Sequence, residues 1–383
     1  MIMMMSGIVR GEAVAAEWSA EPSLSVRGVY NSNLLLTNGN NEVWGNWVSP
    51  NMKFKGATES LQIDGTARGE FVQYYGSTDR GLTNLYFPVR ASYRWDRFTF
   101  GFEGGFTRDN TLMSELQQTG LVLNFTQRNL WTATPSLTIG LTERLRLQLD
   151  YRFSDASYQN GLSLGLVNYQ INGGSSKLSY NLRDRTQVQI TGDLVNFVAP
   201  DIDQTWTYYG AGAGLSHNLS QSIIATVSGG VRFINSNQGL SSGSLSQNDV
   251  VWLYHASIRK EFERSAISLD GSREINPSGF GRLFQTDRVS GAISHNLTEN
   301  LTASLTGALN FVSVIATVGD QSFPDSRYNS VSPNLSWRFA QWWALDVNYT
   351  YAERIVDNAN QWNFANSTFV MLTYGGPKWS VSR

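Results

Sequence analysis

Apolar and polar residues alternate one by one along much of the chain. From Leu301 to Phe311, every odd-numbered position is apolar or glycine, and most even-numbered positions are polar. The segments Leu61–Phe71, Leu145–Phe153 and Trp343–Tyr351 repeat this alternation. Because successive side chains of a β-strand point to opposite sides of the sheet, the period predicts strands with one apolar and one polar face. No comparable stretch has the spacing of an amphipathic helix.

The segments between these strands alternate between short turns and longer polar loops. Short turns are predicted near Gly56–Ser60, Trp95–Arg97, Thr142–Arg144, Arg183–Arg185, Asn218–Gln221, Glu263–Arg264, Leu297–Asn300 and Ala340–Gln341. Longer loops are predicted near Asn31–Glu42, Tyr74–Asn84, Thr107–Thr119, Ser154–Gly165, Val198–Gln204, Asn235–Asp249, Ile275–Phe284, Val312–Arg327 and Ala352–Phe364. These connections separate about 18 strands, and 16 strands stay an alternative.

Three features favour a closed membrane barrel over a soluble β-sandwich, which is the alternative for a repeated hairpin. The polar faces carry arginine and carboxylate side chains in mid-strand. The apolar faces carry aromatic residues near strand ends, namely Tyr30, Trp95, Phe153, Trp337, Phe339, Trp342, Trp343 and Tyr351. Short turns alternate with long loops, as in outer-membrane barrels with short periplasmic turns and longer extracellular loops. The chain is therefore predicted to be an all-β, antiparallel, up-and-down transmembrane barrel in the bacterial outer membrane.

Composition narrows the function classes. The 383 residues include no cysteine and carry a formal net charge of -2. A disulfide framework or a thiolate metal site is thereby excluded, and a basic face for nucleic acid has no support. The mean hydropathy of -0.26 and the lack of a long apolar run exclude an α-helical membrane protein.

No sequence motif indicates an enzymatic activity. The chain has three histidines, and His255 is the one expected on the polar face, where a structural role is the ordinary one. No nucleophile elbow, zinc-protease, phosphate-loop or calcium-loop motif occurs. We expect no enzyme activity, no cofactor and no metal.

The two ends of the chain differ from its middle. Residues 1–16 resemble a secretory signal peptide whose positively charged start is missing; a disordered leader without an export role is the alternative. Residues 17–375 are predicted to form a single barrel, and residues 376–383 a periplasmic tail. Tyr374 would then serve as the terminal aromatic residue of the last strand.

A short proline motif recurs inside predicted strands. Proline followed by serine or asparagine and then leucine or methionine occurs at Pro22, Pro50, Pro135 and Pro333. Each proline falls on the apolar face by parity. Because proline lacks the N–H that a sheet ladder uses, each should mark a bulge or a gap in pairing. We interpret the repeats as duplicated hairpins.

The segments Glu21–Asn33, Trp131–Leu145 and Leu149–Asp155 together resemble a β-barrel porin family of Gram-negative bacteria. Members of that family often accompany exopolysaccharide-export and exosortase gene clusters. The resemblance covers most of residues 20–375. It implies an outer-membrane barrel that helps polysaccharide to cross the outer membrane, with outer-membrane lipid, the polysaccharide and periplasmic export components as partners. The family supplies no catalytic residues.

Parity identifies the side chains expected to line the lumen. Barrels of 16–18 strands usually hold an aqueous channel, so these residues would meet solute. The candidates are Asp64, Arg68, Glu70, Arg90, Arg94, Glu103, Arg146, Asp150, Arg152, Asp193, His255, Arg259, Asp270, Arg288, Arg338 and Asp346. The alternative is that they pair across strands and brace the wall. Most aromatic residues face outward by parity, with Tyr180 and Tyr209 as candidate exceptions.

A loop that folds inward would set the aperture. The longest candidate is Thr107–Asn129, with Arg108, Asp109, Glu115 and Arg128 as constriction residues; an exposed surface hairpin is the alternative. Three functions stay open at this point: a conduit or accessory in exopolysaccharide export, a general diffusion porin for small solutes, and a non-conducting structural barrel. The sequence leaves the oligomeric state open.

Overall fold

The computed structural model describes residues 16–39, 41–77, 79–114, 126–240, 243–315, 324–357 and 361–382. These residues form 19 β-strands, a short α-helix and two 3₁₀ turns. The first strands are β1 (Glu17–Asn31), β2 (Val43–Ala57), β3 (Leu61–Gly76), β4 (Arg80–Trp95), β5 (Phe98–Asn110), β6 (Gln127–Gly140), β7 (Leu145–Tyr158), β8 (Tyr169–Arg183) and β9 (Thr186–Ala199). The others are β10 (Gln204–Asn218), β11 (Ile223–Leu240), β12 (Gly243–Glu261), β13 (Ser265–Pro277), β14 (Leu283–Asn296), β15 (Leu301–Ile315), β16 (Ser326–Ala340), β17 (Trp343–Val356), β18 (Gln361–Gly375) and β19 (Trp379–Ser382). Helix α1 (Thr111–Ser114) follows β5, and the 3₁₀ turns are η1 (Leu162–Leu164) and η2 (Pro200–Ile202).

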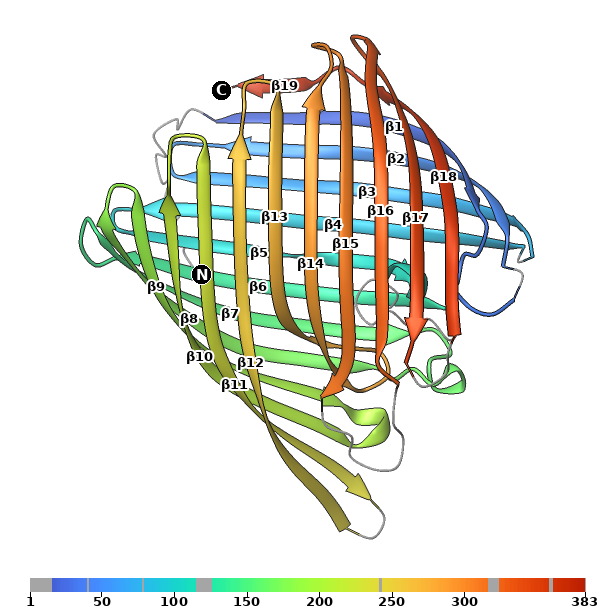
Figure 1. The fold of residues 1–383 in the computed structure, drawn as a ribbon. Helices are drawn as coiled ribbons and strands as arrows, with labels where there is room; N and C mark the ends of the chain where they lie inside the picture. The colour runs from blue at the N-terminus through green and yellow to red at the C-terminus, as the bar shows by residue number, and fades with distance from the viewer. Residues whose placement is uncertain are drawn as a thin grey trace, which may run out of the picture.

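The sheet closes on itself. Each of β1 to β18 pairs antiparallel with its neighbours in sequence, and β1 pairs with β18, with Leu24 opposite Tyr374 (Figure 1). The predicted barrel of about 18 strands is confirmed. The short strand β19 continues the wall beyond β18 by pairing with Glu17–Ala20 of β1. Part of the expected tail thus forms a strand, whereas residues 1–15 of the expected leader lie outside the described residues.

The eight predicted short turns are confirmed, but the strands reach further at the other end than the sequence indicates. β11 and β12 run through most of the segment predicted as the loop Asn235–Asp249, with Asn235 opposite Asn248 (Figure 1). β3 and β4 likewise shorten the loop predicted at Tyr74–Asn84. Strand pairing needs only backbone groups, so a ladder can continue where both faces are polar and the alternating pattern has ended.

The four motif prolines each interrupt one ladder, as expected from the missing N–H. Pairing of β1 stops with β19 at Ala20 and resumes with β18 at Ser23, on either side of Pro22. The ladders β2–β3, β6–β7 and β16–β17 skip Pro50, Pro135 and Pro333 in the same way. The other edge of each of these prolines keeps its pairing.

The outer face of the barrel is apolar. Large hydrophobic side chains alternate there along neighbouring strands, for example Leu305 and Leu309 on β15 and Val289 and Ile293 on β14, and all four are exposed. A belt of exposed apolar side chains with aromatic residues at its rims matches the hydrocarbon core of a bilayer. The barrel therefore spans the bacterial outer membrane. Among the described residues, no helix is both long and apolar enough to cross a membrane.

Candidate functional site in the lumen

The inner face is the face of the sheet that carries the buried side chains. All the lumen-lining candidates alternate with exposed apolar residues and so share this face. Several form ion pairs: Arg90 with Glu103, Arg68 with Glu70, Arg259 with Glu261, Asp193 with Arg232, and His255 with Asp270. Asp150 accepts hydrogen bonds from Gln148 and Ser175. Two of these ion pairs, Arg68–Glu70 and Arg259–Glu261, join residues of the same strand, so bracing across strands accounts for fewer than half of the candidates.

Seven further candidates make no ion pair with any described residue. These side chains are Asp64, Arg94, Arg146, Arg152, Arg288, Arg338 and Asp346. Arg152 and the Asp193–Arg232 pair line one cavity of about 510 Å³ on the inner faces of β7 to β11. Charged groups of both signs at an open, wet wall are the ordinary lining of a water-filled channel rather than a filter for one sign of charge.

Part of the extracellular half of the inner face, on β9 to β11, is apolar and aromatic. Trp206 and Tyr208 on β10 pack with Phe197 on β9 and Ile234 on β11 in one buried cluster. Most aromatic residues face outward as expected, but this cluster places several of them in the lumen. The two candidate exceptions are wrong: Tyr180 and Tyr209 are exposed on the outer face, where the Tyr209 ring stacks on Phe233 with centroids 5.5 Å apart.

Three loops meet over this cluster. The backbone N–H of Val167, between β7 and β8, donates to the carbonyl of Gly279, between β13 and β14, over 2.7 Å. The N–H of Asn168 donates to the Asp201 carboxylate, between β9 and β10, over 2.9 Å. Phe280 is buried among the same side chains. We call residues 159–168, 200–203 and 278–282 the loop cluster; it narrows the extracellular half of the lumen.

One cation belongs to the loop cluster. Arg282 lies in the β13–β14 loop and is largely buried. Desolvation lowers the pKa of its guanidinium from the ordinary value. An arginine nevertheless stays protonated at neutral pH, so Arg282 brings one positive charge to a loop cluster that also contains the carboxylates of Asp201 and Asp203.

The two ends of the segment predicted as the constriction loop belong to strands of the barrel wall. Arg108 and Asp109 belong to β5 and Arg128 to β6, so they are wall residues, while Glu115 lies outside the described residues. Arg108 bonds Asn129 on the outer face. Asp109 and Arg128 form a bidentate pair on the inner face, with bonds of 3.0 and 2.7 Å. Both are nearly fully buried, at the base of α1.

A second narrowing element lies on the opposite side of the lumen. The loop between β1 and β2 and helix α1 place Leu34, Leu36 and Leu112 against the inner face. Below them is a cavity of about 280 Å³, also lined by Arg27, Trp47, Tyr74, Tyr328 and Phe369. We call it the Arg27 pocket.

Arg27 is held by rings and not by an acid. Its guanidinium carbon lies 3.6 Å from the Trp47 ring centroid and 5.1 Å from that of Phe369. Cation–π contacts cover the guanidinium planes and leave its N–H edges available. No ion pair joins Arg27 to a residue in the described part of the chain. The pocket thus presents cationic donors beside aromatic and aliphatic side chains, and its lining also includes Asn31, Asn33, Thr350 and Ser367.

A buried arginine adds to the positive potential nearby. Arg354 on β17 is 5% exposed, and its Nε finds no acceptor among the described residues. It lies opposite Tyr328 in the ladder and two positions from Ala352, and both of these line the Arg27 pocket. A buried cation without a counter-ion is costly, and an anion close to it would offset that cost.

Sequence reasoning missed the Arg27 pocket, although parity already places Arg27 and Trp47 on the inner face. The missing signal is the contact between β1 and β18, since Phe369 reaches Arg27 only through closure of the barrel. Among the described residues, no group of three or more His, Asp and Glu side chains could hold a metal ion.

Comparison with known proteins gives structural likeness only. No family model and no curated protein matches the sequence. Acinetobacter baumannii OccAB4 has a TM-score of 0.48 and 10% identity, covering 95% of this chain and 98% of that chain. The outer membrane protein opdK of Pseudomonas aeruginosa has a TM-score of 0.49 and 12% identity, covering 94% and 99%. Pseudomonas aeruginosa OccK2 (OpdF), solved in complex with glucuronate, has a TM-score of 0.46 and 10% identity, covering 93% and 97%.

Proposed function

We propose that the barrel is a porin-like channel for small polar solutes with a preference for organic anions. The observation that carries this proposal is Arg27, a cation that forms no ion pair with a described acid and lies between two rings beside an open pocket. A carboxylate would bond the guanidinium edge, and an apolar or ring-shaped body would rest against Trp47, Tyr74 and the leucines. The polar wall below conducts solute toward the periplasm.

Arg27→Ala is expected to lower the anion preference of the channel. Reversal potentials in a potassium chloride gradient across planar bilayers should shift toward cation selectivity. Arg90→Ala is the matched control, because Arg90 is already paired with Glu103. Equal shifts in both variants would mean that the pocket has no special role, and so would no shift in either.

Exopolysaccharide export is a second proposal, favoured by the aromatic side chains on the inner face. Trp47, Tyr74 and Phe369 line the Arg27 pocket, where a sugar unit would contact their aromatic side chains. Trp47→Ala should then reduce surface polysaccharide in the producing strain without reducing barrel abundance. Normal polysaccharide in a strain that lacks the whole gene would exclude this role and leave the channel proposal intact.

A further inference from the structure

The wall is incomplete between β12 and β13. Their ladder runs only from Tyr254 opposite Arg273 to Glu261 opposite Ala266. Beyond Tyr254, β12 continues to Gly243 and pairs with β11 alone. Beyond Arg273, β13 continues to Pro277 and pairs with β14 alone. Two facing strand edges therefore separate from this point toward the extracellular side, and we call the gap the β12–β13 seam.

The seam begins within the apolar belt. On the outer face of β12, Trp252 and Val250 lie beyond the last pair and are 68% and 55% exposed. Exposed large apolar side chains at this height mean that lipid surrounds the strand there. An open sheet edge is not tolerated against hydrocarbon, because its N–H and C=O groups stay unbonded, unless it lines a polar cavity.

The end of β13 lies on the lumen side of its neighbours. Ile275 follows Arg273 by two positions and so points to the outer side of β13, yet it is buried. It belongs to the buried cluster that contains Trp206 and Val251, which point inward. It also lines a cavity together with Tyr208 and Arg232 of the inner face. The wall thus overlaps itself, with β13 inside β12.

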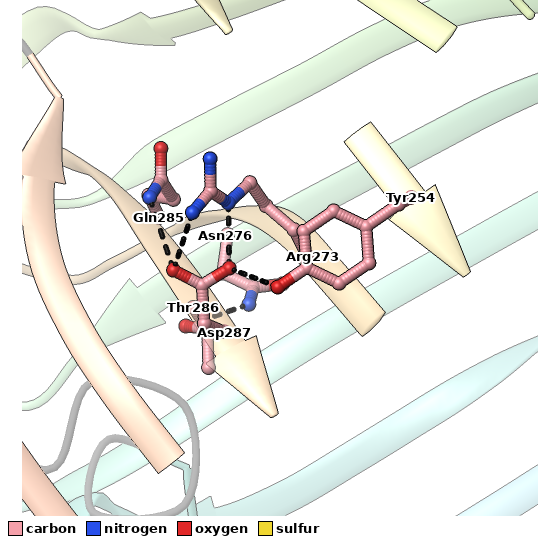
Figure 2. A network of polar contacts seen from close by, with 6 residues as sticks. All are labelled: Tyr254, Arg273, Asn276, Gln285, Thr286 and Asp287. Atoms are coloured by element: carbon pink, nitrogen blue, oxygen red, sulfur yellow. Dashed lines mark hydrogen bonds and ion pairs between the residues drawn. The ribbon is translucent and has the colours of Figure 1, made fainter. Parts of the chain in front are cut away.

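A polar network lies where the strands separate (Figure 2). Asp287 of β14 accepts hydrogen bonds from Tyr254 of β12 over 2.9 Å and from Arg273 of β13 over 2.5 and 2.9 Å. Gln285 donates to the same carboxylate over 3.2 Å. By their position in the alternation, all four side chains belong to the outer face of their strands. A charged pair facing lipid is disfavoured, so its presence marks a place where water or a polar head group reaches the wall.

A groove on the inner face reaches the same place. It measures about 240 Å³ and is lined by Leu253, Tyr254, Arg273 and Glu274 of the seam, together with Asp193, Arg232 and His255. Arg232 and His255 are paired with acids. Glu274, in contrast, makes no ion pair with a described residue. The groove therefore has one acid available for a cation.

We propose that the β12–β13 seam is a lateral portal, through which an amphiphile with a cationic or zwitterionic head enters the groove from the outer leaflet. The head group sits beside Glu274, and the acyl chain leaves between Trp252 of β12 and the apolar face of β14. A small polar solute reaches the groove through the lumen. An opening at hydrocarbon depth serves only a molecule that is already in the membrane.

The state of the seam is tested first by cross-linking in this cysteine-free chain. Trp252→Cys with Ile275→Cys would be directly opposite if the ladder continued, whereas Ile258→Cys with Leu269→Cys is opposite in the ladder that exists. Opposite residues of an antiparallel ladder alternate between hydrogen-bonded and non-hydrogen-bonded pairs. Positions 252 and 258 are an even number of residues apart, so the two cysteine pairs would be of the same kind. Oxidation should cross-link the control pair fully and the seam pair poorly. Equal yields would mean a closed wall and would overturn the proposal.

The ligand is tested with a lysophosphatidylethanolamine that carries a diazirine near its glycerol, reconstituted with the protein in liposomes. Illumination should label inward-facing Leu253 or Glu274 in the wild type. Locking the Trp252→Cys, Ile275→Cys variant with a bifunctional thiol reagent should remove this labelling, while potassium chloride conductance stays. Glu274→Gln should reduce labelling several-fold. Adducts confined to outer-face residues, or no difference after locking, would reject the portal.

Discussion

Phe280→Ala should increase the single-channel conductance of the protein in planar bilayers. Phe280 is 8% exposed and anchors the β13–β14 loop in the apolar cluster. Truncating a buried phenylalanine costs about 3–5 kcal/mol. The interloop hydrogen bond from Val167 to Gly279 contributes only about 0.5–1.5 kcal/mol. The loop should therefore leave the cluster and widen the extracellular half of the lumen.

Gly281→Val is a second test of whether the β13–β14 loop packs into the apolar cluster. Gly281 has φ +67°, and a Cβ there would lie 2.5 Å from Ile202 Cδ1. Gly165→Val is the matched control, because Gly165 has φ +74° and no atom within 4 Å of a built Cβ. Leu162→Ala, which truncates an exposed side chain of the loop cluster, controls for Phe280→Ala. If both Phe280→Ala and Gly281→Val fold and conduct like their controls, the loop cluster does not set the aperture.

The sequence predicts the barrel because a barrel wall is a local pattern. Alternation within Leu301–Phe311 defines a face without reference to any other strand, and the four prolines define their own gaps in pairing. The same parity places Asp64 and Asp346 on the inner face. Strand ends are harder to predict, since Asn235 and Asn248 pair where neither face is apolar.

The sites depend on long-range contacts that the pattern does not encode. Arg27 lies between Trp47 and Phe369 because β1 meets both β2 and β18. The loop cluster unites segments from three hairpins, and Ile275 leaves the wall although its parity is regular. Alternation gives the direction of a side chain relative to its own strand. It does not tell whether that strand stays in the wall or which loop crosses the lumen.

Asp109→Asn should strongly destabilise the barrel. Asp109 and Arg128 hold each other through two hydrogen bonds, with side chains 8% and 6% exposed. Removing one partner of a buried ion pair leaves an uncompensated charge and costs about 3–5 kcal/mol. Urea unfolding in liposomes, followed by the gel shift between folded and unfolded protein, measures this change in the free energy of unfolding.

Glu103→Gln is the control, since it breaks the Arg90–Glu103 pair, whose side chains are 69% and 56% exposed. An exposed pair contributes at most about 1 kcal/mol. The double variant Asp109→Leu, Arg128→Met should be more stable than Asp109→Asn, because it removes both charges from the buried site. If Asp109→Asn lost no more stability than Glu103→Gln, water or another acid would have to neutralise Arg128. The base of α1 would then be held by the ladder between β5 and β6 alone.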